Sequence, residues 1–284
     1  MQLKELHTHF LNELKLLYEP HEASIITAMV LESLAGAGKS DIIIHPHRIV
    51  EKEIQLKIEQ ALTLLKQHQP VQYVIGQAWF YNLLFKVSPA VLVPRPETEE
   101  LVAAVIDFIK SGHSKTLLDI GTGTGCIPIS IKKNLPQILV SALDISEDAL
   151  AIAKENAATH LTEISFIQMN FLDENSWKRM PVFDVIVSNP PYIPENEKEK
   201  LDKNVTAHEP HLALFVPDNQ RLIFYEKIAA FGKDNLSPDG CIFLETHESY
   251  AKEVAAHFLE QGYEAVIKKD FYEKERMVIA NRRR

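Results

Sequence analysis

The sequence contains little cysteine and no long apolar run, and each absence argues against a class of protein. Only Cys126 and Cys241 occur among the 284 residues, without the spacing of metal ligands. No disulfide framework, zinc site or other metal is therefore expected, which fits a reducing compartment. No stretch of about 18 apolar residues is present, so we expect no membrane-spanning helix. Residues 1–5 lack the apolar core of a signal peptide, and we expect a cytoplasmic protein.

Positive charge is also scarce. The chain carries 39 acidic residues against 30 Lys plus Arg, a formal net charge of −9. A protein that grips nucleic-acid phosphates usually carries an excess of basic residues, so direct nucleic-acid binding is not expected. The apolar content of 46% and the charged content of 24% are those of an ordinary globular protein. The length allows one large or two modest domains.

The first 70 residues predict a small helical bundle. Leu3, Leu6 and Phe10 begin an apolar stripe with steps of three and four residues, the spacing of an amphipathic helix. Similar stripes follow at residues 25–34 and 54–65. No motif here carries chemistry, so we interpret residues 1–70 as a domain that recognises a partner.

The chain beyond residue 70 favours β structure. β-branched and aromatic residues predict paired strands at 71–75 and 79–87, joined through Gly76, and we interpret residues 71–94 as a β-hairpin linker. From residue 95 to residue 284 strands alternate with helices, which predicts an α/β domain with a mainly parallel sheet and right-handed crossovers. Strands are expected at residues 116–120, 138–143, 164–168, 182–188, 241–245, 265–269 and 276–280.

A stiff loop is predicted after the apolar run at residues 183–187. The sequence continues as Asn189-Pro190-Pro191-Tyr192, and prolines cannot donate the hydrogen bonds of a sheet, so the strand must end there. Ligands of open α/β sheets bind at this carboxyl edge. The Asn189 carboxamide, the Pro190 carbonyl and the Tyr192 ring suit a planar nitrogen group, an amide or an exocyclic amine. The alternative interpretation is a proline-rich turn with an asparagine cap.

A glycine-rich loop lies between an expected strand and an expected helix. It reads Gly121-Thr122-Gly123-Thr124-Gly125, and Asp144 ends the following strand, where a carboxylate can accept both hydroxyls of a ribose. A dinucleotide fingerprint requires a third glycine where Cys126 stands, and an acid, Asp119, precedes the loop. The pattern therefore favours S-adenosylmethionine over NAD. A tight turn without a ligand is the weaker alternative.

The segment after the third strand of this domain falls where an adenine ring would lie. Phe171 can cover the ring and Asn170 can reach its edge, although the spacing is equally compatible with Phe171 as a core residue.

These motifs resemble the HemK/PrmC family of protein-(glutamine-N5) methyltransferases, and the resemblance extends over most of the chain. The matching segments are residues 70–76 with Phe80, 93–99 (Val-Pro-Arg-Pro-Glu-Thr-Glu), 119–125, Asp144, 188–192, and Glu209-Pro210 with Ala213-Leu214. The segment 93–99 is the most specific, because Asn-Pro-Pro-Tyr is shared with adenine methyltransferases of DNA.

The resemblance implies a Rossmann-like methyltransferase domain with seven strands, the last of them antiparallel, behind a helical domain that meets class I peptide release factors. It implies methyl transfer from S-adenosylmethionine to the glutamine of their Gly-Gly-Gln motif, which leaves S-adenosylhomocysteine. The implied catalytic residues are Asn189, Pro190 and Tyr192, with Pro191 joining them in substrate binding. The implied cofactor residues are Gly121, Thr122, Gly123, Thr124, Gly125, Asp144, Asn170, Phe171 and Asn189.

The chain departs from the family pattern in three places. Asn170 stands where many members have an acid, and residues 245–247 and 271–275 lack the usual glycines. Two other activities remain alternatives, an adenine-N6 methyltransferase acting on DNA or RNA and a glutamine methyltransferase acting on a ribosomal protein. The acidic composition argues against the first of them.

Overall fold

The computed structural model describes residues 1–112 and 114–283, so Arg284, the last residue of the predicted methyltransferase domain, lies outside the described residues. The chain forms two compact units. The first comprises Met1–Gln77 and Asp202–His208, and the second comprises Ala78–Leu201 and Glu209–Arg284. No helix among the described residues is long and apolar enough to cross a membrane.

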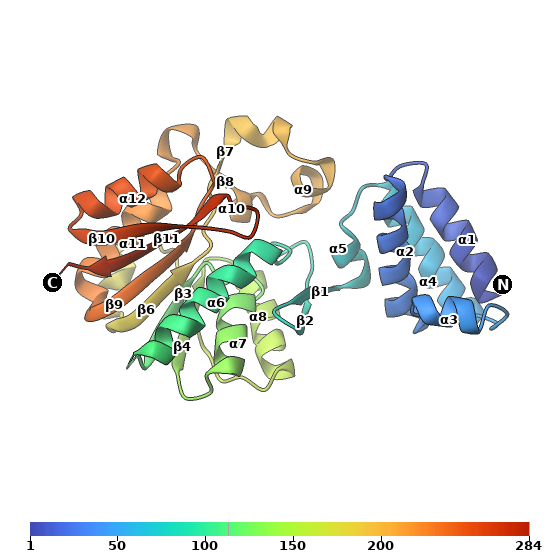
Figure 1. Ribbon diagram of the computed structural model, residues 1–284, viewed down its shortest axis with the longest axis horizontal. Helices are drawn as coiled ribbons and strands as arrows, with labels where there is room; N and C mark the ends of the chain where they lie inside the picture. The colour runs from blue at the N-terminus through green and yellow to red at the C-terminus, as the bar shows by residue number, and fades with distance from the viewer. Residues whose placement is uncertain (113, 284) are drawn as a thin grey trace. The chain divides into compact units, whose positions relative to one another are not determined.

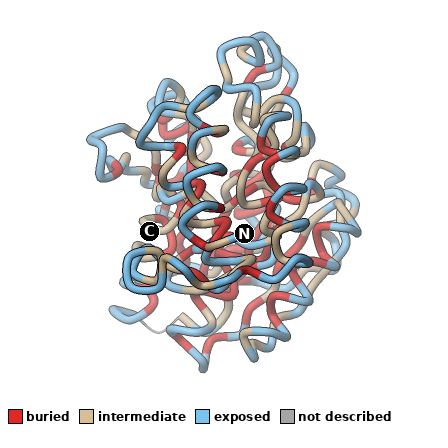
Figure 2. Tube along the Cα trace, turned by 90° about the vertical axis from the view of Figure 1, so that its right-hand side faces the viewer, coloured by how far each residue is buried: buried red, intermediate tan, exposed pale blue. Residues whose placement is uncertain are grey.

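The first unit is a helical bundle, as the sequence predicts. Leu3, Leu6 and Phe10 are fully buried, and the helices expose one side while burying the other (Figure 2). The later segment Asp202–His208 also belongs to this unit. Its His208 ring nitrogen Nε2 donates a hydrogen bond to the Gln67 carbonyl oxygen at 2.9 Å. The helices of the unit are α1 (Leu3–Leu14), α2 (Pro20–Ala35), α3 (Lys39–Ile44), α4 (Lys52–Lys66), α5 (Val71–Ile75) and α9 (Lys203–His208).

The strand expected at residues 71–75 is wrong, because these residues form helix α5. Pro70 stands at its N-cap and Gly76 ends it in the left-handed region, with φ 72°. Val71, Val74 and Ile75 have helical spacing and pack against the core of the bundle. Burial of that face outweighs the β propensity of the individual side chains. The hairpin lies instead within β1 (Gln77–Phe80) and β2 (Leu83–Lys86).

The second unit is built on one seven-stranded sheet among the described residues, with the strand order β10-β11-β9-β6-β3-β4-β5. Its central pairs are parallel, while β11 is antiparallel to both neighbours, which confirms the predicted fold. The strands are β3 (Thr116–Ile120), β4 (Leu139–Asp144), β5 (Ser165–Gln168), β6 (Phe183–Ser188), β9 (Leu236–Glu245), β10 (Tyr263–Lys269) and β11 (Glu275–Arg282).

Helices cover both faces of this sheet. Figure 1 shows α6, α7 and α8 on one side of the strands and α11 and α12 on the other. Alternate residues of the strands feed the two cores, as when Val185 and Val187 pack on the first and Ile186 on the second. The helices are α6 (Pro96–Ser111), α7 (Cys126–Asn134), α8 (Glu147–Thr159), α10 (His211–Leu214), α11 (Ile223–Asn235) and α12 (Ala251–Glu260). A short parallel pair, β7 (Ile193–Pro194) with β8 (Phe215–Val216), and 3-10 turns at Glu174–Arg179, Glu195–Lys200 and Asp218–Gln220 complete the unit.

The parallel strands bring the predicted motifs to one edge. Ile120 pairs with Ser188, Ser188 with Leu244, and Asp144 with Gln168, so β3, β4, β5, β6 and β9 end side by side. The glycine loop, Asp144, the Asn170 loop and the Asn-Pro-Pro-Tyr loop all follow these ends. The sheet therefore assembles the candidate site from segments that are distant in sequence.

Candidate functional site

A cavity of about 190 Å³ lies at the carboxyl edge of the sheet. Its wall includes eight of the predicted site residues: Gly121, Gly123, Asp144, Asn170, Phe171, Asn189, Pro190 and Pro191. Four others, Thr122, Thr124, Gly125 and Tyr192, lie behind the wall and do not line the cavity.

The glycine loop is fixed by its backbone. Gly121 and Gly123 have φ values of 75° and 52°, which residues with a side chain rarely adopt. The N–H groups of Gly121 and Thr122 both donate to the Leu143 carbonyl, each at 2.9 Å, and tie the loop to the end of β4. Gly125 allows close packing behind the loop, since a Cβ there would meet the side chains of Ile129 and Ala153 at 3.0 and 3.2 Å.

Asp144 is held at the cavity by two backbone groups. Its Oδ2 accepts from the N–H of Gly123 at 2.9 Å, and its Oδ1 accepts from the N–H of Ser146 at 3.0 Å. A carboxylate oxygen can accept more than one hydrogen bond, so each oxygen keeps acceptor capacity. The carboxylate is therefore preset to bind a pair of neighbouring hydroxyl groups.

A second acid, Asp119, is fully buried in β3 beneath the glycine loop. Burial raises its pKa to about 7, although the neighbouring Thr122 hydroxyl lowers it, and the charge of Asp144 raises it further. Its two oxygens accept no hydrogen bond of ordinary geometry from the described residues. Asp119 thus carries unused acceptor capacity directly behind the cavity.

Phe171 is both core and cavity wall. Its side chain is 4% exposed, and its ring contacts Trp177 and Phe231 with centroid separations of 5.2 and 5.4 Å. The neighbouring Asn170 is exposed on the same wall, where its Oδ1 accepts from the N–H of Leu172 at 3.1 Å. The two interpretations of Phe171 from the sequence are therefore compatible with each other.

Asn189 has a defined orientation. Its Nδ2 donates to the Thr98 hydroxyl at 3.1 Å, and that hydroxyl donates to Oε2 of Glu245 at 2.7 Å. Thr98 and Glu245 are each 2% exposed. Since the nitrogen end of the carboxamide is engaged behind the wall, the oxygen end is left as an acceptor for the cavity.

Tyr192 supports this arrangement from behind. Its hydroxyl donates to Oε1 of Glu245 at 3.3 Å, and its ring meets His247 edge to face at 6.1 Å. Burial and the Glu245 charge raise the pKa of Tyr192, so the hydroxyl keeps its proton. Tyr225 donates to the Glu245 backbone carbonyl at 3.1 Å. Burial raises the pKa of the Glu245 carboxyl to about 7, against the lowering effect of the Thr98 hydrogen bond.

Two walls of the cavity are joined by an ion pair. Arg95 Nη2 lies 2.6 Å from Oε1 of Glu209, whose side chain is only 2% exposed. The wall includes residues 90–92, which precede Arg95, and Pro210, Leu212 and Ala213, which follow Glu209. The sequence alone did not reveal a partner for Arg95, nor a role for Thr98 and Glu245. The one feature of the sequence that pointed to Arg95 and Thr98 as functional residues is the family-specific segment 93–99, which contains both.

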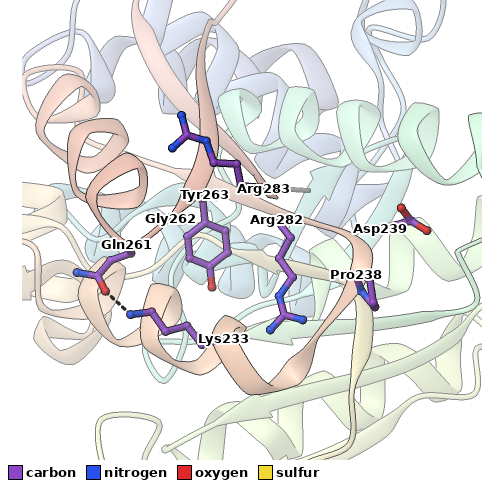
Figure 3. A pocket seen from close by; sticks show the side chains of 8 residues that line it. All are labelled: Lys233, Pro238, Asp239, Gln261, Gly262, Tyr263, Arg282 and Arg283. Atoms are coloured by element: carbon purple, nitrogen blue, oxygen red, sulfur yellow. Dashed lines mark hydrogen bonds between the residues drawn. The ribbon is translucent and has the colours of Figure 1, made fainter.

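A larger depression, of about 570 Å³, lies at the opposite end of the strands (Figure 3). It is lined by Lys233, Tyr263 and Arg282 among others, but the Lys233 ammonium already donates to Gln261 at 2.5 Å and the Tyr263 hydroxyl to Ala229 at 2.7 Å. None of the predicted site residues lines it. No group of three or more His, Cys, Asp or Glu in the described ranges can hold a metal ion.

Comparison with known proteins agrees with this geometry. Residues 99–209 match the family described as "Methyltransferase small domain", and residues 5–76 match the "PrmC N-terminal domain". A release factor glutamine methyltransferase of Flavobacterium psychrophilum is 39% identical over 99% of both chains. One of Bacteroides thetaiotaomicron is 38% identical over 94% of this chain and 95% of the relative. The crystal structure of a ribosomal protein L11 methylase from Lactobacillus delbrueckii subsp. bulgaricus shares the fold, with a TM-score of 0.50 and 18% identity over 70% of this chain and 84% of its own.

Proposed function

The chain belongs to the release factor glutamine methyltransferase family, and from this premise we propose that it methylates the side-chain amide nitrogen (N5) of the glutamine in the Gly-Gly-Gln motif of class I release factors. The methyl donor is S-adenosylmethionine, and the second product is S-adenosylhomocysteine. The observation that carries this proposal is the orientation of Asn189, whose oxygen is free for the cavity because its nitrogen is bonded to Thr98.

The cavity wall fits the cofactor. Asp144 supplies charge-assisted acceptors for two ribose hydroxyls, and the open backbone of Gly121 and Gly123 allows a close approach. Asp119 offers unused acceptor oxygens beneath the loop for a cationic amino group. Asn170 and Phe171 form the part of the wall suited to the adenine. When bound, S-adenosylmethionine supplies an electrophilic methyl group on a positively charged sulfur.

The substrate glutamine is oriented by two acceptors. An amide nitrogen is a poor nucleophile, because its lone pair is delocalised into the carbonyl. Hydrogen bonds from its two N–H groups to the Asn189 Oδ1 and the Pro190 carbonyl increase electron density on the nitrogen and fix its direction of approach. Orientation of this kind contributes up to about 7–11 kcal/mol in the best model reactions. No side chain at the wall acts as a general base, so the proton leaves late, when methylation has made it acidic.

Substrate docking and methyl transfer are assigned to different parts of the chain. We propose that residues 1–70 together with helix α5 dock the release factor, that the β1–β2 hairpin and the residues up to 94 form the linker, and that residues 95–284, apart from Asp202–His208 of the first unit, carry the transfer. Tyr192 lies behind Asn189, so we propose that it supports substrate binding through Glu245, and Pro191 keeps the loop rigid. A cytoplasmic location fits an enzyme whose substrate serves translation.

The test is transfer of a labelled methyl group to purified class I release factor. We expect label on the wild-type factor and none on the matched factor whose motif glutamine is changed to glutamate, because the carboxylate has no N–H to donate. Double-stranded DNA and ribosomal protein serve as competing acceptors in parallel reactions. Labelling of DNA alone would instead support the adenine-N6 activity, and labelling of ribosomal protein alone the related glutamine activity.

A further inference from the structure

We infer that Thr98 and Glu245 are positioning residues for methyl transfer, because together they force the Asn189 carboxamide to present its oxygen rather than its nitrogen to the substrate. The inference rests on the proposed function. Neither residue lines the cavity, so both act through Asn189.

The direction of the hydrogen bonds follows from counting protons. Above its pKa of about 7 the Glu245 carboxylate is ionised and has no proton to donate, so the single proton of the Thr98 hydroxyl must point to Oε2 of Glu245, 2.7 Å away. The Thr98 oxygen can then only accept from its other neighbour. That neighbour, at 3.1 Å, is the Asn189 side chain, which must offer its N–H group. The Asn189 oxygen is consequently excluded from this contact.

These hydrogen bonds are needed because the shape of the site alone cannot determine which end of the Asn189 carboxamide faces the substrate. The oxygen and nitrogen ends of a carboxamide are nearly equal in size, so a half-turn of Asn189 would fit the same space. Turned in that way, Asn189 would direct N–H groups at the N–H groups of the substrate amide. The acceptor needed for transfer would be lost while the wall kept its form.

Glu245 is itself held from several directions. The Tyr192 hydroxyl donates to its other oxygen at 3.3 Å, so both carboxylate oxygens are engaged. The Tyr225 hydroxyl donates to its backbone carbonyl at 3.1 Å. These donors come from the Asn-Pro-Pro-Tyr loop and from α11, while Thr98 comes from the first turn of α6. The carboxylate therefore cannot turn away from Thr98.

The experiment compares Thr98→Val, Thr98→Ser and Glu245→Met in the full chain. Valine keeps the shape of threonine without its hydroxyl, and serine keeps the hydroxyl. Methionine removes the acceptor, which frees the Thr98 proton to point at Asn189 and favours the reversed carboxamide. We expect kcat on release factor to fall about 10- to 100-fold for Thr98→Val and for Glu245→Met, approaching the loss of one transition-state hydrogen bond. We expect Thr98→Ser to stay within about 2-fold of the wild type by the same reasoning.

Three further readouts separate positioning from structural support. KM for the release factor and the Kd for S-adenosylhomocysteine should stay near wild-type values in Thr98→Val and Glu245→Met, and the Tm should stay near the wild-type value in Thr98→Val. The double variant Thr98→Val with Glu245→Met should be no slower than Thr98→Val alone, because without the hydroxyl the carboxylate has nothing to direct. Should one variant fail to fold, the other single variant together with the Thr98→Ser control still decides the question.

Wild-type kcat in both Thr98→Val and Glu245→Met would overturn the inference. It would also be overturned if cofactor affinity and Tm fell together with kcat in every variant, including Thr98→Ser. These outcomes differ from a failure of the proposed function, in which the wild-type enzyme itself would not label the release factor.

Discussion

Breaking the ion pair between Arg95 and Glu209 should open the cavity. Arg95→Met leaves the Glu209 carboxylate buried, with a side chain 2% exposed and the Val93 N–H at 3.4 Å as its remaining donor among the contacts described. Removing one partner of a fully buried pair typically costs about 3–5 kcal/mol. Because the Arg95 side chain is 34% exposed, water screens part of this interaction, and we expect a cost of about 2 kcal/mol.

This cost should appear as weaker cofactor binding. The pair joins the wall residues 90–92 to Pro210, Leu212 and Ala213. The unpaired Glu209 carboxylate therefore reaches water at the lowest free-energy cost if the second of these segments moves outward. About 2 kcal/mol corresponds to a roughly 30-fold higher Kd for S-adenosylhomocysteine, measured by titration calorimetry. Glu209→Gln removes the buried charge but keeps an acceptor for Arg95, so its effect should be smaller. The double variant should recover part of the loss.

The matched control is Arg221→Met. Arg221, which directly follows the 3-10 turn Asp218–Gln220, pairs at 2.8 Å with Glu253 of α12, and both side chains are nearly half exposed. Such surface pairs contribute about 0–1 kcal/mol, so neither Tm nor cofactor affinity should move appreciably. If Arg95→Met and Arg221→Met gave the same Kd, the ion pair would not hold the wall closed.

Three other changes should give distinct results. Asp144→Ala should raise the Kd for S-adenosylhomocysteine by about 10- to 150-fold, since one charge-assisted bond contributes about 1.5–3 kcal/mol, and calorimetry showing unchanged affinity would remove Asp144 from the site. Asn189→Ala should lower kcat about 10²–10³-fold with little change in cofactor affinity, and near-normal turnover would reduce Asn189 to a turn residue. The burial-raised pKa of Glu245, about 7 against 4.5, means that its stability contribution is fully present below about pH 4.5 and lost as the pH rises through 7. The Tm of Glu245→Met should therefore rise relative to wild type over that range, and a pH-independent difference would contradict the shift.

The order of strands and helices in the second unit was predictable because each element has its own apolar period. Parallel strands buried on both faces are continuous apolar runs, as at residues 183–187, and crossover helices separate them. The same reasoning failed at residues 71–75. Val71, Val74 and Ile75 favour a strand by residue type and a helix by spacing, and the core of the bundle decided between them.

The site was predictable only where its residues are neighbours in sequence. The glycine loop and the Asn-Pro-Pro-Tyr loop carry their chemistry in short segments, and the sheet brings both to one edge. Contacts between segments were not predictable. Asn189 and Thr98 are 91 residues apart, Arg95 and Glu209 114, and Thr98 and Glu245 147. Which polar side chains meet across such separations depends on the register of the strands, and no local pattern encodes it.

Two buried acids of the sheet, Asp119 and Glu245, lower the stability of the folded state. Asp119 pairs in register with Ala142 and Val187, and Glu245 pairs with Met277, so the neighbours of both acids on the adjacent strands are apolar. Burial raises the pKa of each to about 7, which means that ionising either carboxyl lowers the stability of the folded state. Apolar residues there would make a more stable sheet. Both acids stand at the carboxyl ends of strands, one beneath the cofactor loop and one behind Asn189. The presence of acids at these two positions is therefore better explained by binding and orientation at the cavity than by folding.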